Sequence, residues 1–144
     1  MKRLTTLFFA LLTAGIASGQ QWNSDFALAQ AQAKASGKNI LLVFSGSDWC
    51  APCIRLDKSV WQSEAFKLEA ANWTLVKADF PKKKNHALSP ELTAANAKLC
   101  ETYNPEGNFP LVVMLDPSGK VIGKMGYLDV PASEYIQKIH GLLK

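Results

Sequence analysis

The sequence is poor in the side chains that hold structural metal ions, with two histidines and three cysteines among 144 residues. A structural zinc site takes four such ligands, usually supplied in two pairs. Only one close pair is present, Cys50 and Cys53, because Cys100, His86 and His140 stand apart from one another along the chain. This distribution disfavours zinc, and we expect no metal ion. The odd number of cysteines leaves at least one thiol unpaired or paired with another molecule.

Long apolar runs are also scarce. The run at residues 7–17 has 11 residues, whereas a membrane-spanning helix needs about 20. It follows Lys2 and Arg3 and ends in Ala17-Ser18-Gly19, which is the layout of a secretory signal peptide. We therefore expect a signal peptide at residues 1–19, one domain at residues 20–144 and a periplasmic or secreted protein. An uncleaved membrane anchor is the alternative.

A strong charge of either sign is missing as well. The formal net charge is +4, and removing the two cations of the expected signal peptide lowers it from +4 to +2. A charge this small gives no reason to expect nucleic acid as a partner. Export instead places the chain in a compartment where disulfides form and persist.

The hydrophobic pattern predicts helices that alternate with short apolar strands. The expected helices cover residues 22–36, 51–60, 63–72, 91–103 and 131–143, and the expected strands cover residues 39–45, 73–80, 111–115 and 120–125. Asp25 or Ser24 caps the first helix, Gly37 ends it, and Ser89 caps the fourth. In the third helix we expect Phe66 and residues 68–70 to face the core. This order predicts an α/β fold with a central mixed sheet flanked by helices on both faces.

The stretch FSGSDWCAPCIRLD, residues 44–57, places the cysteine pair directly after the first buried strand. Pro52 favours the first turn of a helix, where its missing N–H needs no partner. At this point the chain resembles the thioredoxin-like superfamily, and within it the exported thiol–disulfide oxidoreductases of the Dsb type. The resemblance rests on the strand before WCAPC, the helix after it, Phe109-Pro110 before a later strand, and Gly126. It implies a thioredoxin-like three-layer fold.

The resemblance also implies roles for the motif. Cys50 would be the exposed nucleophile and Cys53 the resolving thiol, with Ala51 and Pro52 supporting the turn between them. Disulfide exchange needs a thiolate that attacks a sulfur through a mixed disulfide. A helix N-terminus stabilises negative charge, and CxxC motifs there lower the thiol pKa from about 8.5 to roughly 3.5–7.5. The absence of histidine between the cysteines favours a reductase or isomerase over an oxidase.

Three further residues would contact the substrate if the resemblance holds. Pro110 would be a cis-proline that faces the cysteine pair, Phe109 would touch the substrate backbone, and Trp49 would flank the nucleophile. The implied function is reduction or isomerisation of disulfides in exported proteins, by a monomer without an organic cofactor. A thiol electron donor would recharge it, and a membrane-bound thiol transporter is one candidate. The alternatives are a binding module or chaperone of the same fold with idle cysteines, a metal-handling protein, and a structural disulfide.

The chain departs from its relatives in two places. Relatives often carry a buried acid in the strand before the motif, but residues 41–44 are Leu-Leu-Val-Phe, and we do not assign that role to Asp48. Asn108 separates a glycine from Phe109-Pro110, which changes the loop before the proline.

Two features fall outside the motif. We interpret Cys100 as a buried inert thiol, with a second redox thiol or an intermolecular bridge as the alternative. Lys82, Lys83 and Lys84, followed by His86, read as a solvated loop. Because this loop follows a strand parallel to the one before the motif, we also consider that it borders the active site and adds positive potential there.

Overall fold

The computed structural model describes residues 20–144, so the signal peptide expected at residues 1–19 lies outside the described part of the chain. Five strands form one sheet in the order β1-β3-β2-β4-β5. The strands are β1 (Trp22–Asn23), β2 (Ile40–Ser45), β3 (Thr74–Asp79), β4 (Leu111–Leu115) and β5 (Val121–Met125). β1, β3 and β2 run parallel, whereas β4 is antiparallel to both β2 and β5. The expected mixed sheet is confirmed.

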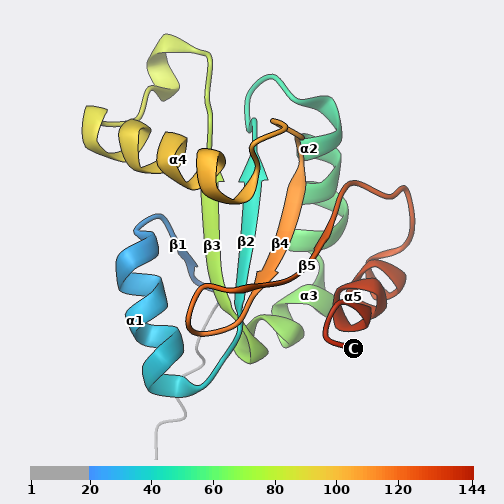
Figure 1. Ribbon diagram of the computed structural model, residues 1–144. Helices are drawn as coiled ribbons and strands as arrows, with labels where there is room; N and C mark the ends of the chain where they lie inside the picture. Colours follow the sequence, from blue (N-terminus) through green and yellow to red (C-terminus); the bar gives the residue numbers. More distant parts are fainter. Residues whose placement is uncertain (1–19) are drawn as a thin grey trace, which may run out of the picture.

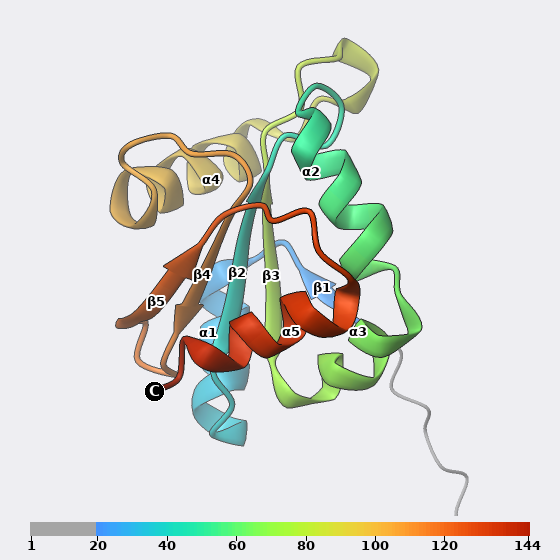
Figure 2. The same ribbon diagram turned by 90° about the vertical axis from the view of Figure 1, so that its right-hand side faces the viewer.

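Helices cover both faces of this sheet (Figures 1 and 2). They are α1 (Phe26–Ser36), α2 (Ala51–Leu56), α3 (Glu64–Glu69), α4 (Pro90–Tyr103) and α5 (Ala132–Gly141), with short helical turns η1 (Asp57–Trp61), η2 (Ala70–Asn72) and η3 (Lys84–His86). Helices α1 and α4 lie on one face, and α2, α3 and α5 lie on the other. Between residues 20 and 144, none of the helices has the length and apolar character needed to cross a bilayer.

The two halves of the core are built by alternation along the central strands. In β2, Leu41 and Val43 face the layer of α2, α3 and α5, while Ile40, Leu42 and Phe44 face the layer of α1 and α4. All six residues of β2 are buried, which explains why this strand reads as a continuous apolar run rather than an alternating one. The strand therefore ends at a point enclosed by both helical layers.

The structure corrects the beginning of the first predicted helix. Trp22 and Asn23 form β1, paired in parallel with Leu75 and Val76 of β3, and α1 begins at Phe26. Sequence periodicity includes Trp22 in the helix, but pairing with a distant strand overrides the local pattern. The Asp25 cap is confirmed, because its side chain accepts the Leu28 N–H at 3.0 Å.

Two further helix ends match the sequence prediction, whereas one predicted core residue does not. Gly37 ends α1 with φ 72°, a left-handed conformation that glycine adopts without strain, and Ser89 caps α4. Phe66 is buried as expected, but the prediction for Leu68 is wrong, since it is 82% exposed. The third predicted helix is an α-helix of only six residues followed by η2. Leu68 therefore points away from the sheet.

Candidate active site

The cysteine pair lies where β2 ends and α2 begins. After the strand, the chain turns so that the Cys50 N–H donates to the Gly46 carbonyl at 2.9 Å. Cys50 is the N-cap of α2, with extended backbone angles, and Pro52 occupies the first turn of the helix. A buried strand and a proline-led helix thus fix Cys50 at the helix N-terminus, as the sequence predicts.

Cys50 and Cys53 are joined in a disulfide, with their Cα atoms 5.2 Å apart. The Cys53 N–H donates to the Cys50 sulfur at 3.3 Å, and the Gly46 N–H donates to the Cys53 sulfur at 3.4 Å. The expectation that Cys50 is exposed is wrong for the disulfide form, since Cys50 is 5% and Cys53 3% exposed. In the disulfide form, little of either cysteine is therefore accessible to solvent.

Phe109 and Pro110 lie at the same end of the sheet as this disulfide because β4 pairs with β2. Leu111, the first residue of β4, is in register with Phe44, so the residues before β4 reach the end of the sheet where the motif begins. The Phe109–Pro110 peptide bond is cis. Pro110 is buried, while Phe109 is partly exposed. Ala51 lies exposed at the start of α2.

The loop before Phe109 is held by a residue that the sequence analysis does not single out. Asn104 is fully buried at the end of α4. Its side-chain amide donates to the Asn108 carbonyl at 2.8 Å, and its side-chain oxygen accepts the Asn108 N–H at 2.9 Å. The departure from the family pattern at Asn108 is therefore accommodated by a specific backbone clamp. An asparagine at the start of the turn Asn104-Pro105-Glu106-Gly107 is the signal that could have indicated it, because asparagine side chains bond nearby backbone groups in turns.

Trp49 forms the wall next to Cys50. Its indole Nε1 donates to the Phe80 carbonyl at 2.6 Å, and its ring meets the Phe109 ring edge-on with centroids 5.6 Å apart. The indole also packs so closely on Gly46 that a Cβ there would overlap it. Trp49 nevertheless remains 39% exposed, so a fixed aromatic surface faces solvent beside the disulfide.

The lysine loop borders this site. The Asp48 carboxylate accepts the backbone N–H groups of Lys82 and Lys83, each at 2.9 Å, and lies 3.1 Å from His86 Nδ1. These contacts hold the pKa of Asp48 below its ordinary value, with the Lys82 N–H contributing most. Lys82 places Nζ 3.9 Å from the centroid of the Trp49 ring. The predicted position of the loop is confirmed, and Asp48 is the residue that secures it.

Several other side chains from the sequence analysis lie away from the disulfide. Cys100, on α4, is partly buried, and its thiol donates to the Asn104 carbonyl at 3.4 Å. Burial raises the pKa of Cys100. His140, on α5, lies 3.0 Å from a carboxylate oxygen of Glu69. Among residues 20–144, no three histidine, cysteine or acidic side chains are grouped so that they could hold a metal ion.

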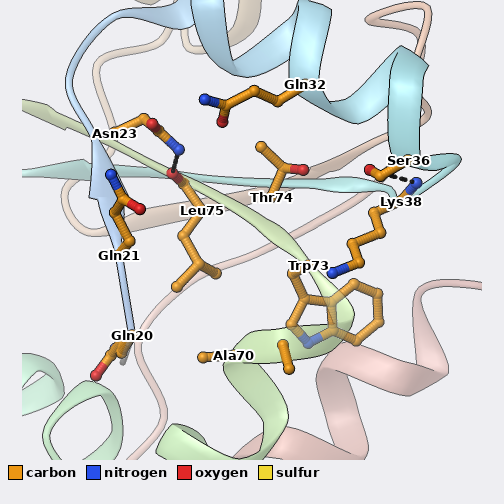
Figure 3. A pocket seen from close by; sticks show the side chains of 11 residues that line it. Gln20, Gln21, Asn23, Gln32, Ser36, Lys38, Ala70, Trp73, Thr74 and Leu75 are labelled. Carbon is orange, nitrogen blue, oxygen red and sulfur yellow. Dashed lines mark hydrogen bonds between the residues drawn. The ribbon is translucent and has the colours of Figure 1, made fainter. Parts of the chain in front are cut away.

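A separate pocket of about 270 Å³ lies at the opposite end of the sheet. Figure 3 shows polar side chains around it, including Asn23, Gln32 and Thr74. The Asn23 amide is already engaged, since it donates to the Leu75 carbonyl at 3.0 Å. Thr74 begins β3, whereas the cysteine pair follows the end of β2, so this pocket takes no part in the chemistry of the disulfide.

Comparison with known proteins agrees with this geometry. A model of the thioredoxin-like family matches residues 21–117. The disulfide bond reductase DsbH of Chlamydia pneumoniae is 36% identical over 129 residues, which cover 89% of this chain and 75% of that protein. A solved structure named DsbH oxidoreductase superposes with a TM-score of 0.80 at 31% identity, covering 96% of this chain and 94% of the other.

A disulphide isomerase from Xylella fastidiosa gives a TM-score of 0.58 at 25% identity, over 79% of this chain and 87% of the other. The resemblance inferred from the motif is confirmed. The family match and the DsbH similarity both include the strand, the cysteine pair and the strand after Pro110. The chain therefore belongs to the thioredoxin-like family.

Proposed function

We propose that this protein is an exported protein-disulfide oxidoreductase that reduces or isomerises disulfides in other exported proteins. The observation that carries the proposal is the Cys50–Cys53 disulfide at the N-terminus of α2, in a chain similar to a disulfide bond reductase. The pair can open and close by thiol exchange alone. The proposed reaction therefore uses no metal ion or organic cofactor.

In the reduced protein, the Cys50 thiolate attacks one sulfur of a substrate disulfide. A Cys50–substrate bond forms, and the other substrate sulfur leaves as a thiolate that takes a proton from solvent. Cys53 then attacks the Cys50 sulfur, which re-forms the internal disulfide and releases the second substrate thiol. Two electrons pass from the cysteine pair to the substrate, so a thiol donor must reduce the pair again.

The N-cap position distinguishes the two cysteines better than exposure does. The Cys50 sulfur already accepts an N–H from the first turn of α2, and such donors favour a thiolate. Cys53 lies within the first turn and faces the interior. Cys50 is therefore proposed as the nucleophile and Cys53 as the resolving thiol, with Ala51 and Pro52 setting the turn between them.

Trp49, Phe109 and Pro110 are proposed to form the surface on which the substrate lies. The two aromatic rings contact each other edge to face, and Trp49 is held by its bond to the Phe80 carbonyl. Aromatic rings that are fixed before binding supply contact area at little entropic cost. An extended substrate segment next to a disulfide would contact these rings while its sulfur meets Cys50.

The proposal also includes a direction of electron flow and a location. The similarity to DsbH supports the reductase direction and, with the expected signal peptide, an exported location. We propose that the protein acts as a monomer and receives electrons from a thiol donor, with a membrane-bound transporter as the candidate.

The test is reduction of insulin by the mature chain with dithiothreitol as donor. We expect Cys50→Ser to lose the activity and Cys100→Ser to retain it, because Cys100 lies on α4 outside the motif. Equal rates for wild type and Cys50→Ser would reject catalysis and favour the binding module or chaperone. The reduction potential of the Cys50–Cys53 pair then decides the direction, because a reductase holds its disulfide at a potential below that of its substrates.

A further inference from the structure

Three consecutive lysines stand at the rim of the proposed active site. Lys82, Lys83 and Lys84 belong to the loop that follows β3, and all three are exposed. Between residues 20 and 144, no carboxylate forms an ion pair with any of them. Their positive charge therefore acts on molecules that approach the rim.

The backbone holds this loop in place. The Asp48 carboxylate accepts the N–H groups of Lys82 and Lys83, each at 2.9 Å. At the start of the loop, the Phe80 N–H donates to the Ser45 carbonyl at 2.9 Å. The Asp48 side chain is only 3% exposed, so its negative charge is directed to the loop backbone rather than to solvent. The loop thus presents its cations outward from a support that is tied to the motif.

The lysines lie next to the aromatic surface proposed to bind the substrate. β3 and β4 lie on opposite sides of β2, so the loop after β3 approaches the motif from one side and Phe109 from the other. Trp49 contacts both: its ring centroid lies 5.6 Å from that of Phe109 and 3.9 Å from Lys82 Nζ. A substrate segment that covers both rings therefore comes within reach of the lysines.

The acidic side chains near this rim are engaged or lie elsewhere. Asp79, which ends β3, accepts the N–H and the hydroxyl of Ser47. Glu91 lies in the first turn of α4, where a helix N-terminus favours a negative charge. Glu106 is exposed in the turn that leads to Phe109. A substrate on the two rings thus meets the lysines beyond Trp49 and an acid on the other side.

We propose that Lys82, Lys83 and Lys84 make the protein selective for substrates with acidic residues beside the reactive cysteine. An acidic segment that extends past Trp49 lies against the ammonium groups, whereas a basic segment is repelled. Charge matching of this kind mainly raises the rate of productive encounter, and salt weakens it. The inference rests on the proposed function and adds a substrate class: exported proteins whose disulfide is flanked on one side by aspartate or glutamate.

The test uses short fluorescent peptides joined through a disulfide to a quencher, so that reduction releases fluorescence. The peptides share one length and differ only beside the cysteine, where they carry glutamates, glutamines or lysines. Stopped-flow mixing with reduced protein gives a second-order rate constant for each, and the same series with dithiothreitol corrects for intrinsic reactivity. At low salt we expect the glutamate peptide to react roughly three- to tenfold faster than the glutamine peptide, and the lysine peptide more slowly than either. In about 0.5 M NaCl the glutamate-to-glutamine ratio should fall below about twofold.

Two triple variants keep the result specific. The loop variant combines Lys82→Gln, Lys83→Gln and Lys84→Gln, and it retains the backbone N–H groups that Asp48 accepts. The control variant removes the same charge from exposed residues at the opposite end of the sheet, through Lys34→Gln, Lys38→Gln and Lys120→Gln. We expect the loop variant to lose the preference for the glutamate peptide and the control to keep it. Since any change in Cys50 reactivity or folding affects the glutamine peptide equally, the ratio reports the attraction of the substrate.

Several outcomes would contradict the inference. A corrected wild-type ratio near one overturns it, as does a ratio that persists in the loop variant or falls equally in the control. A ratio near one together with binding to phosphatidylglycerol vesicles that requires the loop lysines would assign them to a membrane surface, and the inference would again be wrong. Failure of the wild-type protein to reduce any of the peptides would instead reject the proposed function itself.

Discussion

Lys82 lies over the face of the Trp49 indole, with Nζ 3.9 Å from the ring centroid. The contact joins the loop after β3 to the residue that precedes Cys50. A cation over an exposed aromatic ring contributes about 0.5–1 kcal/mol, and here it also places a positive charge next to the proposed nucleophile. Figure 1 shows the loop and the start of α2 at the same end of the sheet.

We expect Lys82→Met to lower the fraction of Cys50 present as thiolate near neutral pH. A nearby positive charge favours a thiolate, and an exposed charge acts weakly because solvent screens it. The alkylation rate of Cys50 by iodoacetamide in the reduced protein should fall about two- to threefold. Lys138→Met, on α5, removes a lysine paired with Glu134 and should leave the rate unchanged. An unaltered rate in Lys82→Met would show that the loop adds no useful potential at Cys50.

The hydrogen bonds that Asp48 accepts from the backbone of Lys82 and Lys83 should make the stability of this loop depend on pH. Hydrogen bonds from Lys82 and Lys83 lower the pKa of Asp48 below its ordinary value of 3.8. The carboxylate is thus favoured in the folded state, and its stabilising effect is complete above pH 3.8 and is lost as the pH falls through the lowered pKa. In Asp48→Asn this part of the pH dependence should disappear.

To test this, the urea concentration at the midpoint of unfolding is measured for wild type and Asp48→Asn between about pH 2 and 6. Limited proteolysis of the loop at neutral pH is measured alongside. Asp48→Asn should flatten the acid limb of the stability curve and speed cleavage within residues 81–88. Asp129→Asn removes a carboxylate outside the loop and serves as the matched control. If Asp48→Asn and wild type lose stability in parallel as the pH falls, the hydrogen bonds of the Asp48 carboxylate do not contribute to the stability of the folded protein.

Gly46 has a steric requirement that a conservative substitution should reveal. A methyl group there would overlap the Trp49 indole, and overpacking of this kind costs about 1–3 kcal/mol. We expect Gly46→Ala to lower the free energy of unfolding by that amount and to displace Trp49, with a change in its fluorescence. A methyl group at Gly141 would meet no atom within 4 Å, so Gly141→Ala should be neutral or stabilising. Equal effects of the two substitutions would contradict the close packing of Gly46 and Trp49.

Cys100 should react slowly as long as the protein is folded. Burial raises the pKa of Cys100 above its ordinary value of 9.0, so little thiolate exists near neutral pH. In the oxidised protein Cys100 is the one free cysteine of the sequence, and its alkylation can be followed directly by mass spectrometry. Labelling near pH 7 should be at least about tenfold slower than in urea, and should accelerate only above about pH 9. Equally rapid labelling in both states would show that the thiol is accessible and open to intermolecular pairing.

The parts of this molecule that could be predicted are those with a local signal. The cysteine pair, the buried strand before it and the Ser89 cap each follow from a few neighbouring residues, and the structure confirms them. The strand at Trp22 could not be predicted in the same way, because its pairing partner is more than fifty residues away at Leu75. Short strands of this kind are defined by their neighbours and not by their own composition.

In the active site, too, some features have a local sequence signal and others depend on residues outside the motif. Trp49, Phe109 and Pro110 could be placed from the motif, but their supports come from elsewhere in the chain. Asp48 reaches the loop that starts after β3, and Asn104 reaches the residue before Phe109. Nothing in the neighbourhood of Asp48 indicates its partner, since that bond depends on how the strands are ordered in the sheet. Asn104 and Asn108 are only four residues apart, but their bond depends on how the turn between them folds.

The π-helical turn that follows α2 has a consequence for how this chain can change in length. Such a turn contains one residue more than an α-helical turn, and deleting a residue from a helix rotates everything after it by about 100°. At the start of the turn, the Asp57 carboxylate pairs with Lys77 of β3, with 3.1 Å between Lys77 Nζ and the nearer carboxylate oxygen. At its end, Trp61 packs edge-on against Phe66 and Tyr135 in the core. A substitution in this segment changes a single side chain, whereas any insertion or deletion between Cys53 and Trp61 redirects every side chain after it and must disturb either the contact of Asp57 with β3 or the aromatic core.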